Sequence, residues 1–218
     1  MQGQIERIIG QLRKATAQFQ KPAATQIIDQ YGKDPYLILI SCILSLRTKD
    51  TVSFPASQRL FSCATTPKAM LLLPVGLIER AIYPCGFYRT KAKTIHTISA
   101  DLIARFGGQV PASRDALLTL KGVGPKTANL VLSEAFDVPA ICVDTHVHRI
   151  SNRFGIVSTQ TPEQTEAALK KVLPQEYWGE WSRLLVMWGQ NVCVPISPKC
   201  STCPLLRVCK RVGVTLSR

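Results

Sequence analysis

"LKGVGPKTANL", residues 120–130, decides how this chain folds, because it sets two glycines and a proline between a leucine-rich segment and an apolar one. Glycine allows a positive φ or the close approach of another backbone, and Pro125 has the φ of a first helical residue. The stretch therefore predicts helix, tight turn, helix over about residues 113–136. The N–H groups of such a turn and of the helix start form a donor site for a phosphate oxygen. An ordinary helical corner, with glycine used only for its geometry, is the alternative.

The rest of the chain has the helical period of apolar residues and almost no strand signal. The amino-terminal segment is amphipathic and unlike a signal peptide, and "VPAICV", residues 138–143, has no partner strand and is predicted to be a connecting segment. The fold class is therefore all-α. Beyond the amino-terminal helix, we expect helices at residues 35–46, 66–72, 76–82, 89–105, 113–120, 126–136, 145–154, 163–172 and 177–190.

The chain is strongly basic, with 27 Lys and Arg against 14 Asp and Glu and a formal net charge of +13 over 218 residues. A charge of this size indicates a polyanionic partner, and nucleic acid is the leading candidate; an excess that only keeps the protein soluble is the alternative. The longest apolar run, residues 36–46, is far shorter than the roughly 20 residues of a membrane span. We therefore expect a cytoplasmic protein with no membrane partner.

Eight cysteines fall into two groups. Cys42, Cys63, Cys85 and Cys142 are scattered among apolar neighbours, and we interpret them as small buried side chains. The other four follow a C-x6-C-x2-C-x5-C pattern near the carboxyl end: Cys193, Cys200, Cys203 and Cys209. Four thiolates can hold tetrahedral zinc or an iron–sulfur cluster, whereas disulfides are disfavoured in a reducing cytosol.

The hairpin "LKGVGPKTANL" resembles the helix-hairpin-helix motif of the endonuclease III superfamily of DNA glycosylases. "AFDVPAICVDTHVHRISNRFGI", residues 135–156, resembles a second signature of that family, and the cysteine spacing is similar to its [4Fe-4S] loop. The resemblance extends over nearly the whole chain. It implies a six-helix bundle lobe over 28–138, and a discontinuous lobe over 1–27 and 139–218 that carries the cluster loop at 193–209, with an active-site cleft between them.

The resemblance also implies a function: a bifunctional DNA glycosylase and lyase of base excision repair. Its partner would be double-stranded DNA that contains a damaged base, an oxidised pyrimidine, or an abasic site. We expect it to act as a monomer and, in a bacterium, to associate with the nucleoid. A [4Fe-4S] cluster on the four carboxyl-terminal cysteines is the implied cofactor.

By position in these motifs, Lys126 is the nucleophile that attacks the sugar and Asp144 is the essential carboxylate. The positive end of a helix macrodipole, with partial desolvation, predicts a lowered pKa for Lys126, which favours the neutral amine that a nucleophile needs. From the residues alone, the favoured interpretation of Lys126 is a phosphate contact or a solvated helix residue. Asp144 is likewise a plain helix cap before "THVHRISNRF".

Two further segments match the family's residues that fill the gap left by an extruded nucleotide. "ILSLRTKD", residues 43–50, places Arg47 where glutamine is typical, and "GFYRTKAKTI", residues 86–95, places Phe87 as an aromatic wedge, unless it is a core residue. Arginine only donates and always carries charge, so Arg47 puts the lesion range in doubt. A glycosylase for another lesion or mismatch, and a non-catalytic DNA-binding module on the same scaffold, remain alternatives.

The predicted DNA-binding set is completed by residues from three segments. Lys121 replaces a proline usual in the hairpin, and Arg149 is expected to meet a phosphate or a carboxylate. His148, one residue before Arg149, is interpreted as structural and is not part of this set. The remaining members are Lys91, Gly122, Gly124, Thr145 and His146.

Overall fold

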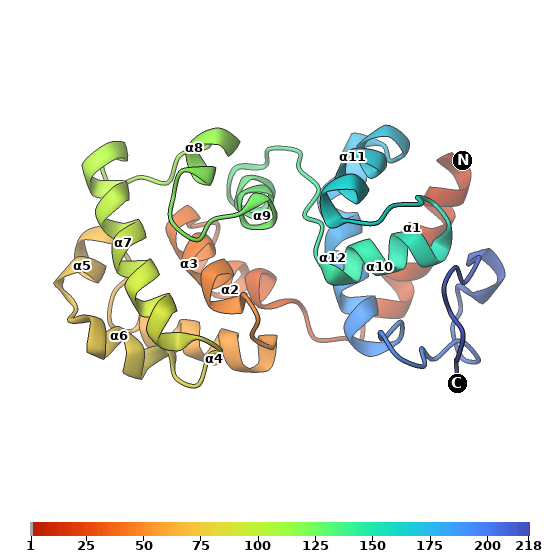
Figure 1. Ribbon diagram of the computed structural model, residues 1–218, viewed down its shortest axis with the longest axis horizontal. Coiled ribbons are helices and arrows are strands. Elements are labelled where there is room, and N and C mark those ends of the chain that lie inside the picture. The colour runs from red at the N-terminus through yellow and green to blue at the C-terminus, as the bar shows by residue number, and fades with distance from the viewer. Residues whose placement is uncertain (1) are drawn as a thin grey trace. The chain divides into compact units, whose positions relative to one another are not determined.

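The computed structural model describes residues 2–218, with side chains from residue 3 onward, and all regular secondary structure in that range is helical (Figure 1). Met1, the first residue of the predicted discontinuous lobe, lies outside the described residues. The α-helices are α1 Gln2–Thr16, α2 Ala23–Tyr31, α3 Pro35–Ser45, α4 Asp50–Phe61, α5 Pro67–Leu72, α6 Val75–Ile82, α7 Tyr88–Phe106, α8 Arg114–Leu118, α9 Pro125–Phe136, α10 Thr145–Phe154, α11 Pro162–Val172 and α12 Trp178–Asn191. There are also two 3₁₀ turns: η1, Gln175–Tyr177, lies between α11 and α12, and η2, Leu206–Val208, lies in the cysteine segment that follows α12.

Two of these helices, α2 and α4, were not predicted. α4 contains Pro55, which removes an amide donor from the helix interior and hides the pattern. α2 begins directly after Pro22 and has no side-chain cap. By contrast, α3, α5 and α11 each begin with a capping Asp or Thr followed by proline at the first turn, which is a readable start signal. Residues 138–143 form the connecting segment that was predicted.

The chain divides into two compact units. One runs from Pro22 to Val138 and contains α2–α9, of which α5 and α8 are only six and five residues long. Its centre is α3, where every residue from Tyr36 to Leu44 is buried and which packs on α2, α4, α7 and α9. A boundary at residue 28 would cut α2, so the unit begins ahead of that helix.

The other unit combines the chain up to Lys21 with Pro139–Arg218. It is discontinuous because the apolar face of α1, formed by Ile5, Ile8, Ile9 and Leu12, packs in one core with residues of α10 and α12 such as Trp181. Arg13 also donates to Glu180 at 2.6 Å, and this bond holds the pKa of Glu180 below its ordinary value.

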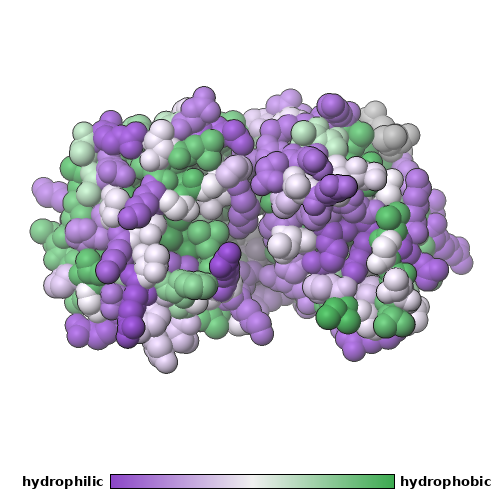
Figure 2. Space-filling model, viewed as in Figure 1, coloured by the Kyte–Doolittle hydropathy of each residue, from purple (hydrophilic) through white to green (hydrophobic). Residues whose placement is uncertain are grey.

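Within residues 2–218, no helix combines the length and apolar character needed to cross a membrane. The apolar run at 36–46 is the buried helix α3. On the face drawn in Figure 2, hydrophilic residues are found over both units, consistent with the large share of Lys and Arg.

Candidate active site and cysteine pocket

The hairpin lies between α8 and α9, and the proline begins the second helix as expected. Gly122 has a φ of 78°, and a Cβ there would lie 3.0 Å from Thr94 Cγ2, so both backbone conformation and space favour glycine. Gly124 has an extended φ of −99° and caps α9, with Pro125 at its first position. The first bond of α9 runs from the N–H of Ala128 to the Gly124 carbonyl at 2.9 Å.

Lys126, the second residue of α9, is half-buried and lies close enough to Cys42 of α3 to affect its thiol. Burial raises the pKa of Cys42 to about 11, and the charge of Lys126 opposes that rise only in part. Cys42 therefore stays protonated near neutral pH. A neutral thiol does not form an ion pair with the amine, so it does not hold Lys126 in its charged form.

Asp144 is the N-cap of α10. Its Oδ1 accepts the N–H groups of His146 and Val147, both at 2.8 Å, and its backbone is extended, as capping requires. One carboxylate oxygen thus takes both capping bonds. The geometry fixes the orientation of the second oxygen, Oδ2, without using it in the cap.

Arg149 was expected to meet a phosphate or a carboxylate, but its guanidinium donates to backbone carbonyls. Its Nη2 lies 2.8 Å from the Cys193 carbonyl and 3.3 Å from that of Gly189, at the end of α12. The pKa of Arg149 is lowered, and burial is the largest cause. Arg149 therefore joins α10 to the start of the cysteine segment, because the terminal carbonyls of a helix lack internal donors.

The two histidines of α10 are packed in different ways. His146 Nδ1 lies 3.1 Å from Arg149 Nη2, and a Cβ on Gly189 would collide with its ring, so α12 has a glycine where the imidazole packs. His148 Nδ1 pairs with Thr165 Oγ1 at 2.6 Å, a contact that fits the structural role predicted for it. Thr145, between the cap and His146, is exposed.

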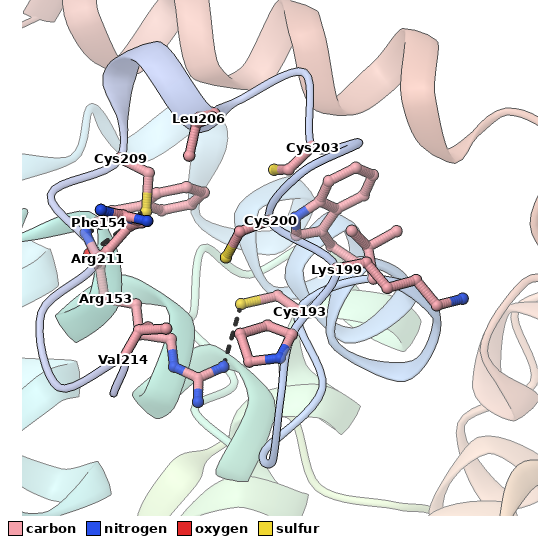
Figure 3. A pocket seen from close by; sticks show the side chains of 13 residues that line it. Arg153, Phe154, Cys193, Lys199, Cys200, Cys203, Leu206, Cys209, Arg211 and Val214 are labelled. Carbon is pink, nitrogen blue, oxygen red and sulfur yellow. Dashed lines mark hydrogen bonds between the residues drawn. The ribbon is translucent and has the colours of Figure 1, made fainter. Parts of the chain in front are cut away.

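The four carboxyl-terminal cysteines line one pocket, together with Phe154 and Trp188 (Figure 3). All four are free thiols, and in the described residues no three His, Cys, Asp or Glu side chains are close enough to hold a single metal ion. Burial raises the pKa of Cys203 to about 11, with further rises from the other three cysteines. Cys42, Cys85 and Cys142 are buried as predicted, but Cys63 is exposed, since it follows the last turn of α4.

Arg153, for which no role was predicted, connects α10 to this pocket. It is 8% exposed and donates to the Cys193 sulfur at 3.3 Å, to the Val194 carbonyl at 2.8 Å and to the Pro195 carbonyl at 2.6 Å. The Arg211 N–H lies 3.4 Å from the Cys209 sulfur. Burial raises the pKa of the Cys209 thiol, and the Arg211 N–H opposes that rise. The spacing of Arg149 and Arg153, one helical turn apart, was a signal that both share one face of α10.

The HhH-GPD superfamily of base excision DNA repair proteins matches residues 40–175, a range that includes the hairpin, Lys126 and Asp144. Endonuclease III of Thermotoga maritima is 46% identical over 177 residues, which cover 81% of this chain and 83% of that protein. This chain belongs to the endonuclease III family. Endonuclease III-like protein 1 of Bos taurus is 44% identical over 77% of this chain, but the match spans only 56% of that longer protein.

Solved endonuclease III structures extend the match over almost the full length. A non-covalent endonuclease III–DNA complex has a TM-score of 0.84 at 34% identity and covers 97% of this chain and 96% of that chain. A trapped endonuclease III–DNA covalent intermediate, an estranged-adenine complex, has a TM-score of 0.79 at 35% identity and covers 94% and 95%. A thermostable thymine-DNA glycosylase, with a TM-score of 0.80 at 24% identity, shares the fold.

In this endonuclease III family member, the predicted gap-filling residues lie side by side on the surface. Arg47 and Phe87 both have positive φ, 51° and 58°, and the Arg47 Cζ lies 5.7 Å from the centre of the Phe87 ring. Phe87 is 63% exposed, which excludes the alternative of a core aromatic. An arginine over an aromatic face is a cation–π pair.

Lys91 was predicted to bind DNA, but its side chain is only 6% exposed. The ammonium donates to the carbonyls of Leu44 and Leu46 at 2.6 and 2.7 Å and to Thr48 Oγ1 at 2.8 Å. Those bonds use its three protons, so it has none for a phosphate. A lysine in a basic segment of sequence is predicted to be a surface cation. Only the tertiary structure shows that the side chain of Lys91 points inward. Lys121, in contrast, is exposed in the hairpin.

Proposed function

We propose that this chain is a bifunctional DNA glycosylase and abasic-site (AP) lyase of base excision repair. It removes damaged pyrimidines, chiefly oxidised ones, through a Schiff base on Lys126, and it nicks the strand by β-elimination. The observation that carries the proposal is the position of the Lys126 amine, directly after Pro125 at the start of the second hairpin helix. A 35% identical endonuclease III has been trapped as a covalent intermediate with DNA, which supports a covalent protein–DNA step on this scaffold.

In the proposed reaction, the neutral amine of Lys126 attacks C1′ of the sugar. A C–N bond forms, the bond from C1′ to the base breaks, and the base leaves with that electron pair and takes up a proton. Opening of the sugar ring gives a protonated Schiff base, whose charge makes the C2′ protons acidic. Loss of one C2′ proton expels the 3′ phosphate by cleavage of the C3′–O bond, and water then releases the lysine.

Asp144 assists this reaction through its carboxylate charge. Positive charge develops on the sugar as the base departs, and a fixed negative group stabilises it. The two capping bonds to Oδ1 keep the carboxylate in one orientation, so its Oδ2 is available without a reorganisation during the reaction. A cap and a catalytic carboxylate are therefore compatible roles for one residue.

Double-stranded DNA is the proposed partner. The hairpin amides near Gly122 and Gly124 are suited to a phosphate oxygen, with Lys121 adding charge beside them. Phe87, exposed next to Arg47, is suited to fill the stack after the damaged nucleotide is extruded. Because the substrate is DNA, we place the protein with the chromosome, which in a bacterium is the nucleoid in the cytoplasm.

A second candidate is a glycosylase for a different lesion or mismatch, and Arg47 favours it. The residue is exposed beside Phe87 and donates hydrogen bonds without accepting any, so it prefers acceptor groups on the base opposite the lesion. Two sets of base-removal rates distinguish the two candidates. One set uses an oxidised pyrimidine paired with each of the four bases, and the other uses each undamaged mismatch.

The decisive experiment incubates the purified protein with duplexes that contain an abasic site or an oxidised thymine, with and without borohydride. Borohydride reduces a Schiff base to a stable amine, so we expect a covalent protein–DNA adduct and, without reductant, a nicked strand. Tight binding with neither adduct nor nick on any duplex would favour the non-catalytic DNA-binding module.

We also propose that Cys193, Cys200, Cys203 and Cys209 hold a [4Fe-4S] cluster. The four thiols line one pocket, and four cysteine thiolates are the ligand set of such a cluster. The cysteine segment would be held in place by its four thiolates on the cluster, and its exposed Lys199, Arg207, Lys210 and Arg211 would be available to DNA phosphates. Figure 3 shows Lys199 directed away from the pocket.

Replacing Cys203 by serine is expected to lower the bound iron and sulfide well below the roughly four of each per chain of an intact cluster. Serine lacks the thiolate, and the remaining ligands cannot complete the set. Iron and acid-labile sulfide analysis of the purified protein measures the loss. Cys63→Ser is the matched control, because Cys63 is exposed in the other unit and should leave the iron content unchanged. Zinc in the wild-type protein in place of iron contradicts the proposal.

A further inference from the structure

Lys91 is an ammonium group that the proposed reaction does not use, held among neutral acceptors. Its three hydrogen-bond partners are two backbone carbonyls and a hydroxyl, and burial lowers its pKa. Burying a cation against neutral groups costs free energy that an apolar side chain of similar length avoids. Packing alone therefore does not account for a lysine at this position.

All three acceptors belong to residues 44–48, the segment that ends α3 and contains Arg47. Lys91 itself lies in the first turn of α7, and its N–H donates to the Phe87 carbonyl at 3.0 Å. One side chain thus connects residues on both sides of Arg47 to the helix that begins directly after Phe87. A shift of either segment would break these bonds.

Thr48 and Gly86 complete the connection. Thr48 Oγ1 accepts from Lys91 and also from the Gly86 N–H at 3.0 Å, so one hydroxyl joins the two segments. A Cβ on Gly86 would lie 2.8 Å from the Arg47 carbonyl oxygen, so the two backbones meet at a distance that only glycine allows. The strained positive φ of Arg47 and of Phe87 is held by these contacts.

We propose that Lys91 is a positioning residue, whose buried ammonium fixes Arg47 and Phe87 as one preorganised pair for insertion into DNA beside the extruded nucleotide. The inference rests on the proposed function and adds the internal support of its DNA-inserting surface. A purely structural Lys91 would contribute to stability alone. A positioning Lys91 affects how the pair enters the duplex, even in a protein that remains folded.

The test compares Lys91→Met with Lys93→Met, using a duplex that carries 2-aminopurine opposite an abasic site. Methionine keeps the apolar stem of Lys91 but donates no hydrogen bond, and Lys93 is an exposed lysine of the same helix, so both variants lose the same charge. Fluorescence of 2-aminopurine rises when a base is unstacked. It therefore reports insertion, while borohydride trapping on the same duplex reports the Lys126 reaction.

For Lys91→Met, we expect the fluorescence rise at saturating protein to fall at least about twofold and kcat/KM for removal of an oxidised thymine to fall about tenfold, as for a misplaced contact group. Trapping at the abasic site should stay within about twofold of wild type, because no damaged base has to be extruded there. Lys93→Met should retain the wild-type fluorescence rise. Equal losses in both lysine variants, or a wild-type rise and kcat/KM in Lys91→Met, overturn the proposal.

Thr48→Val provides an independent test should Lys91→Met not fold. Valine has the shape of threonine without the hydroxyl that Lys91 and Gly86 share, so the same loss of fluorescence is expected, and Thr48→Ser should restore it. A Thr48→Val protein with the wild-type fluorescence rise contradicts the inference. A wild-type protein that gives the fluorescence rise but no adduct disproves the proposed lyase and leaves the positioning role standing.

Discussion

Alanine in place of Lys126 is expected to abolish the borohydride-trapped adduct and strand nicking, and to slow base removal by about a thousandfold or more, as for loss of an activated nucleophile. The substitution removes the amine that forms the C–N bond to the sugar. Lys126 follows Pro125 at the start of α9, and alanine is a good helix former, so the hairpin should keep its fold. Gel analysis of the trapped adduct and single-turnover kinetics measure the effect.

Lys121→Ala is the matched control, because Lys121 is an exposed cation of the same hairpin, five residues earlier in the chain. It should still form the adduct at saturating protein, with weaker binding and a salt dependence of log Kd reduced by about one. An adduct that survives in Lys126→Ala would assign the chemistry to another amine.

The pH profile of trapping tests the predicted state of the amine. If the helix start and partial burial of Lys126 favour its neutral form, the rate of trapping should reach its plateau well below the pKa of free lysine, about 10.4. A rate that rises only near that value contradicts the effect, although it would leave the nucleophile itself unchanged.

The hairpin and the cap at Asp144 could be predicted from the sequence because local rules determine them. Pro125 has the backbone angle of a first helical residue, and an aspartate two residues before His146 can accept the amides that open α10. The same local signals located the starts of most helices. The family resemblance then supplied the chemical roles, which local rules alone do not give.

Other features depended on contacts between distant parts of the chain. Lys91 and Arg149 were expected to face DNA, yet both donate to backbone carbonyls, of residues 44–46 and of the end of α12 respectively. Charge and spacing describe which groups are present but not which carbonyls lack donors in the folded protein. α4 was not predicted because Pro55 lowers the local helix propensity of that segment. The segment is helical nevertheless, because its packing on α3 and α6 outweighs the low propensity.

Asparagine in place of Asp144 is expected to lower the rate of base removal by about 10²- to 10⁴-fold, the range typical of a positioned acid–base or charged group. The stability of the protein should change by less than about 0.5 kcal/mol, because asparagine is as good an N-cap as aspartate. Single-turnover kinetics on an oxidised thymine duplex, together with urea denaturation, separate the two effects. A fall in rate with unchanged stability shows that the charge of the carboxylate acts on the reaction, beyond its role in the cap.

Asp34 offers a control for this substitution within the same chain. It caps α3 with the same geometry, since its Oδ1 accepts the N–H groups of Tyr36 and Leu37 at 2.9 and 3.0 Å. Asp34→Asn should leave both stability and rate close to wild type, whereas alanine at either position should cost about 1 kcal/mol of stability through the lost cap. Equal effects of asparagine on the rate at Asp34 and Asp144 would mean that the carboxylate of Asp144 acts only as a cap. A loss of rate confined to Asp144 would mean that one carboxylate both starts α10 and takes part in removal of the base.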